Sequence, residues 1–132
     1  FDEGLERAWA RHAALARAAR AAVAVWAEKG AIDFNIADPA HRSDSVTTVL
    51  TPGFDPQALR DFTRSRLGVV LGSGIGDLAG KAFRIAHMGY ANPPMVLGTL
   101  GAIEIGLAAL GVPHGRGGVQ AAVEALQGHF TD

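Results

Sequence analysis

Apolar and small residues recur every three or four positions along the first part of the chain. These positions are Leu5, Trp9, Ala13, Ala16, Ala19, Val23 and Trp26. Such spacing is typical of an α-helix that buries one face. Asp2 is a suitable N-cap and Gly30 a suitable stop, so we expect a helix over about residues 3–29. His12 lies on or beside this face, where we favour a hydrogen-bonded structural histidine over a ligand.

A short strand and a short helix are expected next. The β-branched residues 45–50 predict a strand that ends at the turn 51–53. Asp55 before Pro56 predicts a helix start, because Asp caps a helix and Pro suits its first turn. The residues expected to face inward are Leu59, Phe62, Thr63 and Leu67, with Arg60, Arg64 and Arg66 in solvent.

Two more strands are expected on either side of a glycine-rich loop. They cover residues 67–72 and 82–88, and the loop covers residues 72–80. Alternation in the second strand places Phe83, Ile85 and His87 on one face and Arg84, Ala86 and Met88 on the other. The short connection favours an antiparallel pair over a parallel crossover.

Two helices complete the predicted fold. They span about residues 94–110 and 117–126, the second with Val119, Val123 and Leu126 as its apolar face. The element order α, β, α, β, β, α, α predicts an α+β fold, in which helices cover one face of a small, mostly antiparallel sheet. We expect residues 1–132 to form a single domain. Because the chain begins with Phe1 directly before a long helix, we expect it to be part of a longer protein.

Composition excludes several classes of function. The chain has 132 residues with a net charge of −1, so no basic excess is present to bind nucleic acid. It has no cysteine, which excludes disulfides and thiolate chemistry. Its five histidines show no metal-ligand spacing, so no metal site is expected. We expect a cytoplasmic protein.

The apolar residues 95–112 are nearly long enough to span a membrane. Glu104 would then lie near the bilayer centre, at a cost of about 2.5–3.5 kcal/mol. We therefore expect no membrane partner, and a helix that is buried on several sides. Glu104 is expected to be either a buried, paired carboxylate or a group at a solvent-facing rim.

Several short motifs have a structural interpretation that we prefer to a functional one. Residues 74–79 fit the dinucleotide pattern G-x-G-x-x-A, but a strand follows almost at once where a crossover helix is required. Ser43 and Ser45 have no partner histidine nearby in sequence, so we expect them to cap a loop. Lys81 is expected to be an exposed loop lysine rather than a catalytic amine.

Arg84 is the strongest candidate for a functional residue. It occupies the middle of a short strand directly after the glycine-rich loop. A guanidinium there must face water or a partner, because burial of an unpaired charge is prohibitive. Its planar shape suits a carboxylate or phosphate held by two hydrogen bonds. A surface arginine and a structural ion pair remain the alternatives.

Several segments resemble the class V aminotransferases of the serine–glyoxylate and alanine–glyoxylate group. They are residues 80–89 (GKAFRIAHMG), residues 41–49 (HRSDSVTTV) with Pro52, residues 4–12, and residues 98–119. The resemblance covers nearly the whole chain. It implies a pyridoxal-phosphate enzyme of the aspartate-aminotransferase fold type, of which this chain is only the C-terminal small domain.

The resemblance also implies a role for Arg84, which matches the family arginine that binds the α-carboxylate of the amino acid or 2-oxo acid substrate. The implied reaction transfers an amino group from serine or alanine to glyoxylate. The implied partners are these substrates, the chain's own large cofactor domain, and a second copy in a homodimer.

This chain also departs from the family pattern. Neither Lys29 nor Lys81 matches the lysine that forms the Schiff base, so we assign no catalytic, cofactor-binding or metal-binding residue to the chain. The isolated chain is therefore expected to be inactive, to bind no pyridoxal phosphate, and to expose apolar surface that favours self-association. The alternative function is a non-catalytic α+β module that binds a small anion or mediates assembly.

Overall fold

The fold is α+β, as the sequence predicts. The computed structural model describes residues 5–34, 46–74, 76–86 and 92–131. In chain order the elements are α1 (Leu5–Trp26), the 3-10 turn η1 (Ala27–Lys29), β1 (Asp33–Phe34), β2 (Val46–Leu50), α2 (Pro56–Leu67), β3 (Gly72–Ser73), the 3-10 turn η3 (Gly76–Leu78), β4 (Ala82–Ala86), α3 (Pro93–Ala109) and α4 (Gly118–Thr131).

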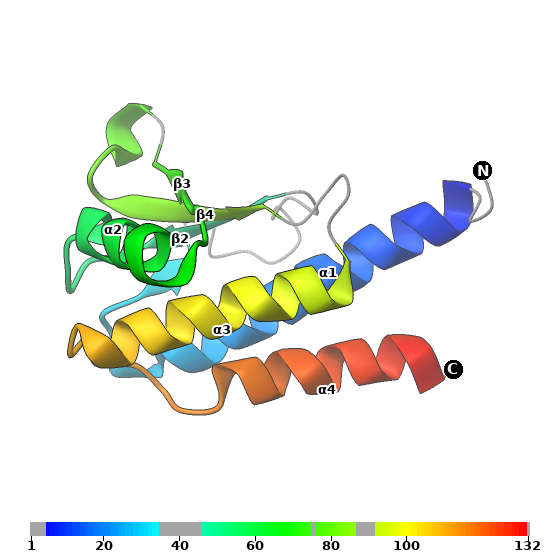
Figure 1. Cartoon of the computed structure of the whole chain (residues 1–132). Helices are drawn as coiled ribbons and strands as arrows, with labels where there is room; N and C mark the ends of the chain where they lie inside the picture. Colours follow the sequence, from blue (N-terminus) through cyan, green and yellow to red (C-terminus); the bar gives the residue numbers. More distant parts are fainter. Residues whose placement is uncertain (1–4, 35–45, 75, 87–91, 132) are drawn as a thin grey trace.

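The four strands form one antiparallel sheet in the order β1-β2-β4-β3. The pairing of β3 with β4 confirms the antiparallel connection expected across the glycine-rich loop. Helices α1, α3 and α4 run side by side on one side of the sheet (Figure 1). Helix α2 contacts α3 and the two strands β3 and β4. The sheet therefore has one face covered by helices.

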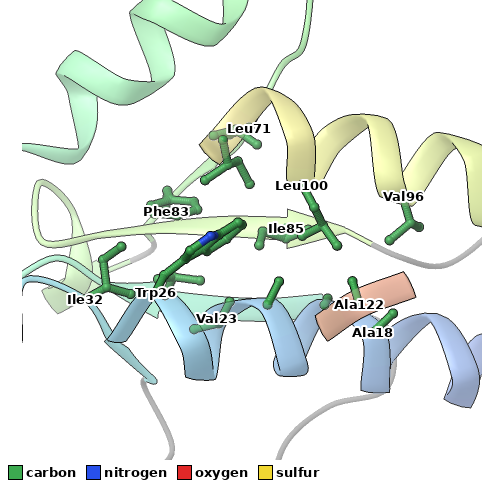
Figure 2. Close-up of a cluster of buried hydrophobic side chains, with 14 of the residues drawn as sticks. Ala18, Val23, Trp26, Ile32, Leu71, Phe83, Ile85, Val96, Leu100 and Ala122 are labelled. Carbon is green, nitrogen blue, oxygen red and sulfur yellow. The ribbon is translucent and has the colours of Figure 1, made fainter. Parts of the chain in front are cut away.

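The core lies between the helices and the covered face of the sheet. Phe83 and Ile85 of β4 are fully buried, as their alternation predicts, and Val49 of β2 is buried beside them. Trp26, at the end of α1, lies within this cluster of apolar side chains (Figure 2). Every described helix contributes to the cluster; examples are Ala18 in α1, Leu59 in α2, Leu100 in α3 and Ala122 in α4.

Glu104 is a partly buried and paired carboxylate, the first of the two arrangements expected. Its Oε1 atom accepts hydrogen bonds from the indole Nε1 of Trp26 at 3.0 Å and from the backbone N–H groups of Gly118 at 3.1 Å and Val119 at 3.4 Å. Helix α3 packs against α1, α2 and α4, as the expected burial on several sides requires, but Met95 and Ile105 on its remaining face are 54% and 53% exposed. Within the described ranges of the chain, no helix combines the length and the apolar character needed to cross a membrane.

The prediction of a strand over residues 67–72 is wrong. Leu67 ends α2, residues 68–71 are irregular, and only Gly72–Ser73 pair with β4. Gly68 ends the helix in the left-handed conformation at φ 72°, which glycine adopts without steric cost. The buried Leu71 belongs to the core, whereas Val70 is 77% exposed.

Other differences concern the boundaries and faces of elements. Strand β1 was not predicted, and α4 continues to Thr131 instead of ending near residue 126. Leu67 and Val123 were expected to face inward but are 39% and 38% exposed. The expected positions of His87 and Met88 lie outside the described residues.

Candidate functional site

Arg84 lies in the middle of the sheet, on the face opposite the helices. Its direct neighbours in the register are Thr48 on β2 and Gly72 on β3. The adjacent residues Phe83 and Ile85 point into the core, so alternation directs Arg84 to the other face. Arg84 is half-buried there, as is Thr48. The fold therefore presents the guanidinium on a face that no described helix covers.

Within the described ranges, one hydrogen bond holds the Arg84 side chain. Its Nε donates to the main-chain carbonyl of Ser73 at 2.7 Å. Among the residues that the structure describes, no carboxylate forms an ion pair with Arg84. The sequence left open that Arg84 forms a structural ion pair, and the described residues do not support this alternative.

The Arg84 guanidinium has the hydrogen-bond donors and the charge needed to bind an anion. A guanidinium has five N–H donors, and the Ser73 carbonyl takes the one on Nε. The four donors on Nη1 and Nη2 have no hydrogen-bond partner among the described residues, and two of them match the oxygen spacing of a carboxylate. Because the charge of arginine is permanent, the site needs no proton transfer to bind an anion.

The two lysines of the chain lie elsewhere and are exposed. Lys29 ends the 3-10 turn after α1, and Lys81 precedes β4. The main chain of Lys81 has a structural role, since its carbonyl accepts from the backbone N–H of Thr51 at 3.0 Å and from the Thr51 hydroxyl at 3.2 Å. The expected exposure of the Lys81 side chain is confirmed.

The remaining candidates do not join Arg84. His12 was expected to be hydrogen-bonded, but its Nε2 is buried without a hydrogen-bond partner among the described residues. Ser43 and Ser45 lie outside the described residues. The described part of the chain also holds no cluster of three or more His, Cys, Asp or Glu side chains that could bind a metal ion.

Sequence reasoning missed the contribution of β3 to this site. The sequence places Arg84 shortly after the glycine-rich loop, but it singles out neither Gly72 nor the Ser73 carbonyl as a neighbour of the guanidinium. Their pairing register with β4 is needed to place them beside Arg84, and a two-residue strand leaves almost no periodic signal.

No protein-family model matches the chain. The serine–glyoxylate aminotransferase of Methylorubrum extorquens is 39% identical over 129 residues, which are 96% of this chain. The serine–glyoxylate aminotransferase of Arabidopsis thaliana is 38% identical over 132 residues.

The chain is homologous to the C-terminal part of the class V aminotransferases. A solved class V structure agrees, since pyridoxamine–pyruvate aminotransferase from Mesorhizobium loti superposes with a TM-score of 0.85 at 38% identity. That match covers 96% of this chain and 32% of the aminotransferase. The chain likewise spans 31% of the Methylorubrum relative, so it corresponds to about a third of a class V aminotransferase.

Proposed function

We propose that this chain is the C-terminal small domain of a longer, pyridoxal-phosphate-dependent aminotransferase, and that Arg84 binds the carboxylate of its substrates. The observation that carries the proposal is the position of Arg84. It lies at mid-strand on the uncovered face of the sheet, and its Nη1 and Nη2 groups have no acidic partner among the described residues. A substrate carboxylate would supply the missing opposite charge.

The names of the relatives support a small 2-oxo acid as the shared ligand. Two relatives are serine–glyoxylate aminotransferases, and the solved structure is a pyridoxamine–pyruvate aminotransferase. Glyoxylate and pyruvate both carry a carboxylate next to the reacting carbonyl, whereas serine and pyridoxamine have little in common. We infer that Arg84 orients this carboxylate, which fixes the reacting carbon relative to the rest of the site. For this chain we propose glyoxylate as acceptor and serine or alanine as donor.

We further infer that this chain does not itself hold pyridoxal phosphate. Lys29 and Lys81 are the only lysines of the chain, and both side chains are exposed, which supports this inference. When bound to an aminotransferase, pyridoxal phosphate supplies an electron sink. We propose that the chain's own large domain holds this cofactor and that the isolated chain is inactive. The single domain over residues 1–132, the homodimer and the cytoplasmic location belong to the same proposal.

Substitution of Arg84 in the full-length protein tests the proposed role. Arg84→Ala removes two charge-assisted hydrogen bonds, so kcat/KM for the oxo acid and for the amino acid should fall by at least about 100-fold. Arg84→Lys should restore little of this loss, because lysine keeps the charge but lacks the two-pronged geometry. Near-normal kcat/KM in both variants would show that Arg84 does not bind the substrate carboxylate.

A further inference from the structure

We propose that β3 is a positioning element for Arg84, with Gly72 and the Ser73 carbonyl fixing the guanidinium so that a carboxylate meets Nη1 and Nη2 and not Nε. This inference rests on the proposed carboxylate-binding role of Arg84. It adds two residues to the site that act through Arg84 and do not touch the substrate themselves.

The Arg84 side chain lies directly over Gly72. A Cβ atom placed on Gly72 would be 3.2 Å from Cβ of Arg84, 3.3 Å from its Nε and 3.4 Å from its Nη2. These three atoms span the side chain from its base to its tip. Any residue other than glycine at position 72 therefore displaces the guanidinium or lifts the whole side chain from β3.

The Ser73 carbonyl, which accepts the hydrogen bond from Nε of Arg84, is itself held in place by the pairing of β3. Ser73 pairs with the fully buried Phe83, and the next residue continues the hairpin, since the N–H of Gly74 donates to the Ala82 carbonyl at 3.2 Å. An acceptor on a paired strand does not reorient when a ligand binds. The 2.7 Å bond to Nε thus fixes the rotation of the guanidinium plane.

The bond to Ser73 selects one of two ways in which arginine can bind a carboxylate. A side-on approach uses Nε and one Nη group, whereas an end-on approach uses both Nη groups. Because the single N–H of Nε already donates to Ser73, only the end-on approach gives the carboxylate two N–H groups without sharing the one on Nε. The carboxylate then lies beyond the tip of Arg84, away from β3.

Gly72→Val in the full-length aminotransferase tests this positioning role. Valine suits a strand, so the fold tolerates it, while its branched side chain occupies the space under Arg84. We expect KM for the oxo acid to rise about tenfold, the effect of losing one charge-assisted hydrogen bond, with kcat changed by less than about twofold. Gly72→Ala should raise KM less, because a single Cβ needs a shift of only a few tenths of an ångström. Gly128→Ala is the matched control, since a Cβ there contacts nothing within 4 Å.

A double-mutant cycle separates positioning from a general structural effect. If Gly72 acts through Arg84, then Gly72→Val should raise KM in the native background and leave it unchanged in the Arg84→Ala background. Two outcomes would overturn the positioning role and leave the carboxylate-binding role intact. In the first, the two substitutions raise KM by independent factors that multiply in the double variant. In the second, Arg84→Ala raises KM but Gly72→Val does not. A KM unaffected by Arg84→Ala would instead overturn the proposed function.

Discussion

Glu104 of α3 and Trp26 of α1 are joined by a hydrogen bond of 3.0 Å between Oε1 and Nε1, although they lie 78 residues apart in the chain. The same oxygen accepts the backbone N–H groups of Gly118 and Val119 at the start of α4. These N–H groups have no partner within their own helix, so Glu104 acts as a cap supplied by another helix. One carboxylate therefore connects three helices, which explains an acidic residue within an otherwise apolar segment.

Removal of this carboxylate should destabilise the domain. Glu104→Ala leaves the Trp26 indole N–H and two helix-terminal N–H groups without their acceptor, so the free energy of unfolding should fall by about 1–3 kcal/mol. Glu104→Gln should cost less, because the amide oxygen still accepts hydrogen bonds. Urea unfolding of the chain measures both effects. Glu124→Gln, at an exposed position of α4, is the control and should change stability little; equal losses at positions 104 and 124 would contradict the capping role.

Gly118 is required for the close contact between α4 and Trp26. A Cβ at this position would overlap Nε1 of the indole and approach its Cδ1 and Cε2 atoms to 2.8 Å. Gly118→Ala should therefore lower stability by about 1–3 kcal/mol, although alanine favours helices elsewhere. Thermal unfolding compares it with Gly128→Ala on the same helix, where the added methyl meets open space and should be neutral or stabilising. A Gly118→Ala variant as stable as the parent would show that α4 packs differently against α1.

The elements with a strong periodic pattern were predictable from the sequence. Ala16, Ala19, Val23 and Trp26 of the predicted α1 face are buried, whereas Ala13 is half-buried. The Asp55 cap of α2 and the alternation along β4 are also found, since each depends on neighbouring residues. The side chain of Asp55 accepts the backbone N–H of Gln57 at 2.9 Å, as a helix cap should.

Features that depend on residues far apart in the chain were not predictable. The sequence could not decide whether Glu104 is a buried, paired carboxylate or a group at a solvent-facing rim, because tertiary packing brings Trp26 and Gly118 to it. The two-residue strands β1 and β3 have no period to recognise, and they exist because longer strands pair with them. For the same reason Arg84 could be singled out from its strand position, whereas the Ser73 carbonyl that holds it could not.

The isolated chain should not form a specific adduct with pyridoxal phosphate. Both of its lysines are exposed, so we expect neither to form an adduct in preference to the other. Borohydride reduction after incubation with the cofactor, followed by peptide mass spectrometry, should find only weak and similar labelling of Lys29 and Lys81. Stoichiometric labelling of Lys81 alone would contradict the proposal that a separate large domain holds the cofactor.

The most direct test of the account compares an acid with its neutral counterpart in the full-length protein. Glyoxylate and its amide differ in the group that Arg84 is proposed to bind, so the native protein should prefer the acid by at least about 100-fold in kcat/KM, the worth of two charge-assisted hydrogen bonds. Arg84→Ala should lose most of this preference, because kcat/KM for the acid should fall while kcat/KM for the amide stays nearly the same. An undiminished preference for the acid in Arg84→Ala would contradict the central claim that this guanidinium recognises the substrate carboxylate.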